Sequence, residues 1–204
     1  CGAEIVGTEY ETLVDGRERC MNCGRTAVKT GSEFTKIFMD VKRNMEAFYG
    51  ISLRVPIKVE MVNTKKLSRR LGKSFVPTPN MDGRTLGVAI KDRNGYTLML
   101  ENGAPRLQSM MTIAHELTHI WQYTNWDEKH LIEKYGKDMD GEVWEGMAKW
   151  VEIQYMLLIG EQAHARREEL ITRARDDEYG RGFLYYVTRY PLSTTQSTLR
   201  TPFE

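Results

Sequence analysis

The segment His115-Glu116-Leu117-Thr118-His119 is the feature that most restricts how this chain can fold. Residues four apart lie on the same face of an α-helix, so both imidazoles can reach one metal ion if the segment is helical. Apolar residues at helical spacing predict that helix, and Pro105 suits its first turn. These apolar residues are Met110, Ile113, Ala114, Leu117 and Trp121.

The chemistry of this pattern is that of a catalytic zinc site. Zinc lowers the pKa of bound water to about 7, and a glutamate between the two histidines can take the proton. The sequence therefore predicts a zinc-dependent peptidase with His115 and His119 as ligands and Glu116 as general base. Gln122 and Asn125 stand where a metzincin needs Gly and His, which excludes that class.

A third ligand is expected from outside this helix. The acids Glu142, Glu145 and Glu152 recur on one face of a second helix predicted over 140–159, and His130 is a further candidate. Glu145 is favoured, because the missing side chain of the next residue, Gly146, would let the two helices approach closely.

Further site residues stay open at this stage. Asp138, Asp140 and Glu142 are candidates for accepting a hydrogen bond from a ligand imidazole. A tyrosine could stabilise the oxyanion of the reaction, and the candidates are Tyr123, Tyr179, Tyr185 and Tyr186. An extended peptide substrate could add to an edge strand; residues 96–101 are the candidate, and the alternative is that they form an internal hairpin strand.

The remaining pattern predicts an α+β fold. A helix is expected over 32–49, capped by Ser32 and ended by Gly50, and a half-buried strand over 53–62. Asn94-Gly95 predicts a hairpin between strands 85–91 and 95–101. Shorter helices are expected over 64–71 and 161–176, and the aromatic segment 179–190 is expected to pack on the core.

Composition narrows the partners and the compartment. Twenty-nine basic residues oppose 28 acidic ones, and this balance favours neither nucleic acid nor an anionic membrane as partner. No apolar run approaches the roughly 20 residues of a membrane helix. Three cysteines fit a disulfide framework badly, whereas Cys20-x-x-Cys23 fits a metal clip in a reducing compartment, so we expect a cytoplasmic protein.

Five segments, in order through nearly the whole chain, resemble the DA-one family of LIM-domain zinc peptidases, known from plant organ-size control. The first is similar to the end of the family's LIM region, and the last to its Tyr-Gly-x-Gly-Phe signature. The segments are residues 14–28, 103–107, 115–121, 145–146 and 176–183.

The resemblance implies a zincin-like fold of gluzincin type, with Glu145 as the third ligand of the catalytic zinc. It implies a LIM-like or zinc-ribbon remnant over 1–30 and a peptidase domain over 31–204. Within that domain, 31–101 would hold a helix and the sheet, and 102–204 would be helical. It also implies cleavage of protein substrates in ubiquitin-linked regulation, with ubiquitin as a partner.

The LIM-like start predicts a second, structural zinc on Cys1, Cys20 and Cys23, with its fourth ligand missing or supplied from elsewhere. The alternative function is a non-catalytic protein-interaction module that zinc stabilises, but such a module has no need of Glu116. A zinc protease that acts on nucleic acid is disfavoured, because the sequence has no basic stripe.

Overall fold

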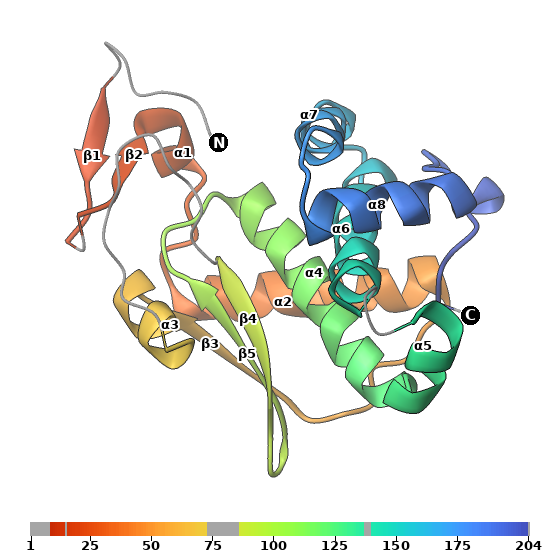
Figure 1. The fold of residues 1–204 in the computed structure, drawn as a ribbon. Coiled ribbons are helices and arrows are strands. Elements are labelled where there is room, and N and C mark those ends of the chain that lie inside the picture. Colours follow the sequence, from red (N-terminus) through yellow and green to blue (C-terminus); the bar gives the residue numbers. More distant parts are fainter. Residues whose placement is uncertain (1–8, 15, 73–85, 137–139, 204) are drawn as a thin grey trace. The chain divides into compact units, whose positions relative to one another are not determined.

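The structure is a computed structural model that describes residues 9–14, 16–72, 86–136 and 140–203 (Figure 1). The chain divides into two compact units. The first comprises Cys1–Asp40 and Val55–Ile113, and the second Val41–Arg54 and Ala114–Glu204. The described elements are helices and two small sheets, which makes the chain α+β. The zincin-like arrangement within that class stays a prediction.

The first unit begins with a small cysteine-containing segment. Strands β1 (Tyr10–Thr12) and β2 (Glu18–Cys20) pair antiparallel, and α1 (Met21–Arg25) follows at once. Two arginines attach this hairpin to the end of the larger sheet. Arg17 forms an ion pair of 2.9 Å with Glu101, and Arg19 donates to the Gly103 carbonyl at 2.6 Å. The predicted domain boundary after residue 30 falls at the loop between α1 and α2 and stays a prediction.

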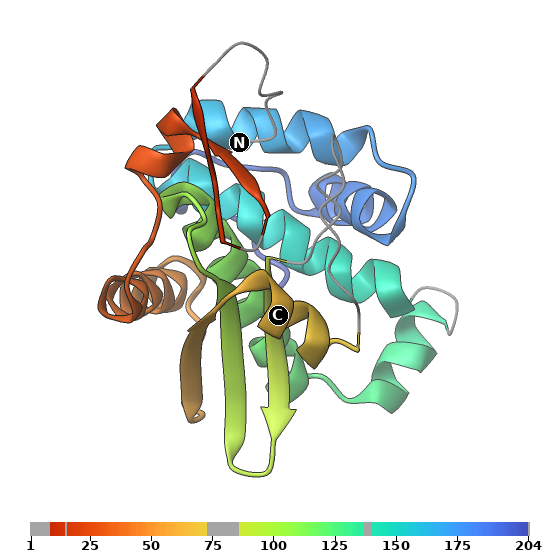
Figure 2. The ribbon, with the colours of Figure 1, turned by 90° about the vertical axis from the view of Figure 1, so that its left-hand side faces the viewer.

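The larger sheet of this unit has the order β3-β5-β4 (Figure 2). Strands β4 (Gly87–Asp92) and β5 (Gly95–Glu101) form the predicted hairpin, while β3 (Ile57–Val62) pairs parallel with β5. The interpretation of residues 96–101 as an exposed strand for substrate is therefore wrong, because both sides of β5 are occupied. The parallel partner of β5, strand β3, is distant in the sequence, because α3 (Thr64–Arg70) lies between β3 and the hairpin.

Helix α2 (Gly31–Tyr49) matches the predicted span and ends at Gly50, whose φ of +66° is the left-handed conformation that glycine tolerates. Its start differs from the expectation. The Thr30 hydroxyl accepts from the Glu33 N–H at 3.2 Å, so Thr30, and not Ser32, caps the helix. The apolar stripe is buried except for Phe48, which is half-buried. The buried members are Phe34, Ile37, Phe38, Val41 and Met45.

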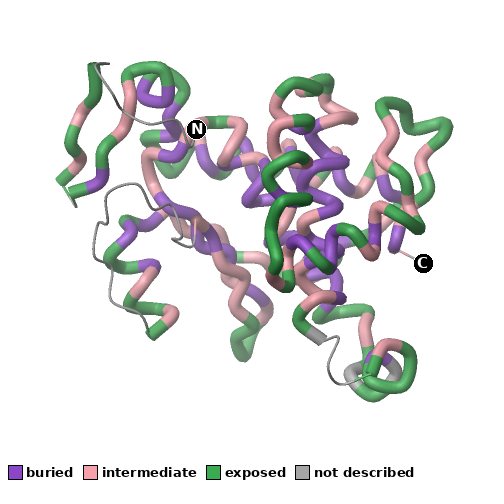
Figure 3. The backbone as a smooth tube through the Cα atoms, turned by 45° about the horizontal axis from the view of Figure 1, so that its top comes forward, coloured by how far each residue is buried: buried purple, intermediate pink, exposed green. Residues whose placement is uncertain are grey.

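The second unit is helical. It contains the part of α4 (Arg106–Asn125) from Ala114 onward, together with α5 (Glu128–Tyr135), α6 (Asp140–Leu158), α7 (Gln162–Arg173), α8 (Glu178–Arg189) and the short 3-10 helix Gln196–Thr198. Helix α6 is buried along most of its length, whereas half of the α7 residues are exposed (Figure 3). In the parts of the chain described, no helix has the length and apolarity needed to cross a membrane.

Helices α6 and α8 cross at two glycines. A Cβ on Gly146 would lie 2.3 Å from the Gly182 carbonyl carbon, and a Cβ on Gly182 would lie 2.1 Å from the Glu142 carbonyl oxygen. No side chain fits between the two backbones there. The sequence predicted a close approach at Gly146 but assigned it to α4; the structure shows that the close neighbour is α8.

Candidate metal centre

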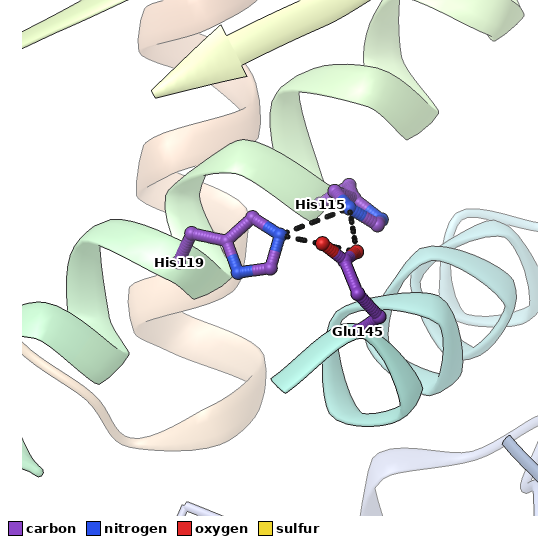
Figure 4. A group of neighbouring side chains, drawn as sticks. All are labelled: His115, His119 and Glu145. Atoms are coloured by element: carbon purple, nitrogen blue, oxygen red, sulfur yellow. Dashed lines mark hydrogen bonds and ion pairs between the residues drawn. The ribbon is translucent and has the colours of Figure 1, made fainter. Parts of the chain in front are cut away.

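Three side chains of the second unit converge from two helices (Figure 4). His115 and His119 lie one turn apart on α4, and Glu145 extends from α6 toward the gap between them. His115 Nε2 and His119 Nε2 are 3.1 Å apart. Glu145 Oε2 lies 3.2 Å from the first nitrogen and 3.4 Å from the second. The predicted ligands therefore meet, and Glu145 is the acid of α6 that joins them.

These separations match a zinc site. A tetrahedral ion with bonds of about 2.0–2.1 Å requires its ligand atoms to stand about 3.3–3.4 Å apart. The three observed distances of 3.1, 3.2 and 3.4 Å form a nearly equilateral triangle of that size. Within the described residues, this is the group of His, Cys, Asp and Glu side chains that could hold a metal ion.

The opposite ring nitrogens are also held. His119 Nδ1 donates to Gln122 Oε1 at 2.7 Å, and Gln122 Nε2 donates to the Trp144 carbonyl of α6 at 3.0 Å, which fixes the orientation of the amide. His115 Nδ1 lies 3.3 Å from Glu152 Oε2. Both Nδ1 atoms therefore carry hydrogen, and both Nε2 atoms face the common point.

This hydrogen bonding corrects the expectation for the supporting residues. Glu142 does not orient a histidine, because it accepts from Arg181 Nε at 2.6 Å. Asp138 lies outside the described residues, as do the side chains of Asp140 and His130. Glu152 was considered as a ligand, but its carboxylate supports the far side of His115 instead.

The charges around His115 favour a cation. Burial opposes protonation of this ring, but Glu145, Glu152 and Glu116 outweigh that effect and raise the pKa of His115 to about 10. Burial also opposes ionisation of Glu145, yet hydrogen bonds with the two histidines hold its pKa well below the usual range. A divalent ion bound by the three side chains would take the place of the proton on His115 and satisfy the same carboxylates.

Two further residues lie near the triad. Glu116 is buried, with 7% of its surface exposed, and its charge acts on both His115 and Tyr179. The Tyr179 ring at the start of α8 stacks on His115, with ring centroids 6.3 Å apart. The Arg175 guanidinium lies 4.5 Å from the centre of the same Tyr179 ring. Burial raises the pKa of Tyr179, and the carboxylates of Glu145, Glu178 and Glu116 raise it further.

The other tyrosines that the sequence proposed pack elsewhere in this unit. Tyr123 packs on Trp144 at 5.2 Å between ring centroids, and Tyr185 contacts both Tyr135 and Tyr186. Of the four candidates, Tyr179 is therefore the tyrosine that the structure brings beside the triad.

The cysteine site is described in part. Cys20 caps α1, and its sulfur accepts from the Cys23 N–H at 3.5 Å. This backbone hydrogen bond is the main cause that lowers the pKa of Cys20, which favours the thiolate that a metal requires. Cys1 lies outside the described residues, so the structural zinc on Cys1, Cys20 and Cys23 stays a prediction.

The family expectation rests on the sequence segments alone. Comparisons with protein-family models, with curated proteins and with solved structures find no match for this chain.

Proposed function

We propose that this chain is a zinc-dependent endopeptidase whose catalytic ion is held by His115, His119 and Glu145. The observation that carries the proposal is the triangle of Nε2, Nε2 and Oε2 atoms with edges of 3.1–3.4 Å. Zinc bound there would lower the pKa of water and polarise a peptide carbonyl. The substrate expected from the sequence is a protein in ubiquitin-linked regulation, with ubiquitin as a partner.

The chain's own residues supply the remaining chemistry. Glu116 follows the first ligand on α4 and is the base that takes a proton from the attacking water. Gln122 and Glu152 hold the two imidazoles so that their Nε2 atoms face the point where an ion would bind. Tyr179 keeps its proton at neutral pH because its pKa is raised, so its hydroxyl can donate to the carbonyl oxygen of a bound peptide.

Glu116→Gln tests this function. The variant should bind zinc as the parent does, because Glu116 is not in the triangle, and should cleave fluorescein-labelled casein about 10²–10⁴-fold more slowly. Zinc per chain is measured by elemental analysis, and cleavage is measured with and without added ubiquitin. Glu142→Gln is the matched control: this acid of α6 pairs with Arg181, so both zinc content and cleavage should stay unchanged.

Two results would contradict the proposal. Full cleavage by Glu116→Gln would remove this residue from the mechanism. A zinc-loaded parent protein that cleaves nothing under either condition would favour the alternative, a zinc-stabilised interaction module. Glu145→Gln separates the metal from the reaction, because it should weaken zinc binding directly, while Glu116→Gln should not.

A further inference from the structure

A second feature of the helical unit is a pocket of about 270 Å³ at the end of α8 opposite Tyr179. Residues of α5, the end of α8 and the segment after α4 line it. Five of its eleven lining residues are aromatic, and two are cations. The residues used below are Trp126, Lys134, Tyr135, Tyr185, Arg189 and Tyr190.

The two cations lie over aromatic rings. The Arg189 guanidinium is 3.6 Å from the centre of the Tyr185 ring, and Lys134 Nζ is 5.1 Å from the centre of the Tyr135 ring. The two rings meet edge to face, with centroids 6.0 Å apart. Arg189 also donates to the Tyr185 carbonyl at 3.2 Å, and the remaining N–H groups of the two cations can donate to an acceptor.

The lining carries two cations against one carboxylate. In the ranges that the structure describes, neither Lys134 nor Arg189 forms an ion pair with a carboxylate. The acid in the lining is Asp127, and its carboxylate accepts from the Lys129 N–H at 2.9 Å as the cap of α5. A ligand that carries a negative charge would therefore complement the wall.

A buried hydroxyl provides an independent observation. Tyr186 lines the same pocket and is 2% exposed, and its hydroxyl has no hydrogen-bond partner among the described residues. A buried hydroxyl without a partner is unfavourable, and native proteins satisfy most such groups with protein, water or ligand. Because Tyr186 lines the pocket, a ligand that displaces the side chains around its hydroxyl could supply a polar atom to it.

We propose that this pocket binds an aromatic carboxylate. The ring would pack among Trp126, Tyr135 and Tyr190, and the carboxylate would accept from Arg189 and Lys134. A cavity of about 150 Å³ holds a benzene ring, so 270 Å³ has room for a ring with a short acidic arm. A free aromatic acid and the C-terminal aromatic residue of a peptide present this same chemistry. The inference does not depend on the proposed peptidase activity.

Calorimetric titration with 3-(4-hydroxyphenyl)propionate tests the site. We expect one molecule per chain with a dissociation constant below about 1 mM, and binding at least about tenfold weaker for the neutral analogue 3-(4-hydroxyphenyl)propan-1-ol. Titration of Gly-Gly-Tyr into Glu116→Gln protein distinguishes the two sources: tighter binding than the free acid indicates a peptide C-terminus, and weaker binding indicates a small acid.

Single charge removals locate the site. Arg189→Gln and Lys134→Gln should each weaken binding of the acid about tenfold, since each removes one charge-assisted hydrogen bond. Lys129→Gln is the matched control, because Lys129 lies on the same helix outside the lining. Equal binding of acid and alcohol, or unchanged binding by both pocket variants, would overturn the proposal. So would the absence of binding at millimolar concentration.

Discussion

The crossing of α6 and α8 can be tested by adding one methyl group. In Gly146→Ala the new Cβ would lie 2.3, 2.4 and 2.6 Å from the carbonyl carbon, Cα and oxygen of Gly182. Ordinary Cβ contacts begin at 3.4 Å, so the two backbones must separate by about 1 Å. The obstruction is backbone, so no side chain can rotate to make room.

Two terms decide the size of the effect. Overpacking of a rigid contact costs about 1–3 kcal/mol, and backbone against backbone belongs at the upper end. Alanine gains about 1 kcal/mol over glycine inside a helix. The net destabilisation is about 2 kcal/mol, which for a chain of this length lowers the melting temperature by about 4–8 °C.

Differential scanning calorimetry on zinc-loaded protein measures the change. Gly31→Ala is the matched control, because a Cβ at that helix position meets no atom within 4 Å. Its melting temperature should equal or slightly exceed that of the parent. If Gly146→Ala melts at or above the parent temperature, the α6–α8 contact is not as close as described. The contact would then not fix which face of α6 points toward α4.

Three further predictions concern metal and stability. Chelation should lower the melting temperature, and zinc at about 1,000 times its dissociation constant should raise the free energy of unfolding by about 4 kcal/mol. A melting temperature that changes with neither treatment would count against the metal site. Glu152→Gln should weaken zinc binding about 10–100-fold in a competition titration, since it alters the support of His115, and unchanged affinity would contradict that role. Asp177→Ala should cost about 1 kcal/mol in urea unfolding, because Asp177 caps α8 by accepting from Gly180 N–H. Its ion pair with Arg175 lowers the pKa of Asp177 in the folded state, so this stabilisation is present at neutral pH and is lost as the pH falls through that lowered value; an equal effect of the variant at pH 7 and in acid would contradict this.

Much of the local structure could be predicted because its signals are local. Asn94-Gly95 specified the hairpin, Gly50 the end of α2, and the apolar spacing around His115 the helix α4. Helix α5 was missed, because its eight residues are mostly charged and the pattern offers little beyond Leu131 to bury. The central place of β5 was missed for another reason: its parallel partner β3 is brought to it by the tertiary fold.

The residues that contact the two histidines were harder to predict from the sequence. Gln122 follows His119 by three residues and so shares its helix face, which the sequence alone could have indicated. At the level of sequence Gln122 excludes the metzincin class, and in the structure its side chain holds the ring of His119. The stacking of Tyr179 on His115 depends on how α8 crosses α6, which no local pattern encodes.

The rotation of α6 explains why two of its three acids face the histidines and the third does not. Successive helical residues turn by about 100°, so Gly146 points about 100° away from Glu145. Because Gly146 is pressed against the α8 backbone, Glu145 is left facing α4. Glu152, seven residues on, returns to within about 20° of Glu145 and also reaches His115.

The same rotation of α6 directs Glu142 toward α8. Three residues before Glu145, it stands about 60° toward the side of Gly146, and there it meets Arg181 of α8. The contact of Gly146 with the α8 backbone therefore fixes the directions of the three acids. Glu145 and Glu152 contact the histidines, and Glu142 contacts α8. The sequence pattern predicts that a third ligand exists, and the contact at Gly146 turns Glu145 rather than Glu142 toward the histidines.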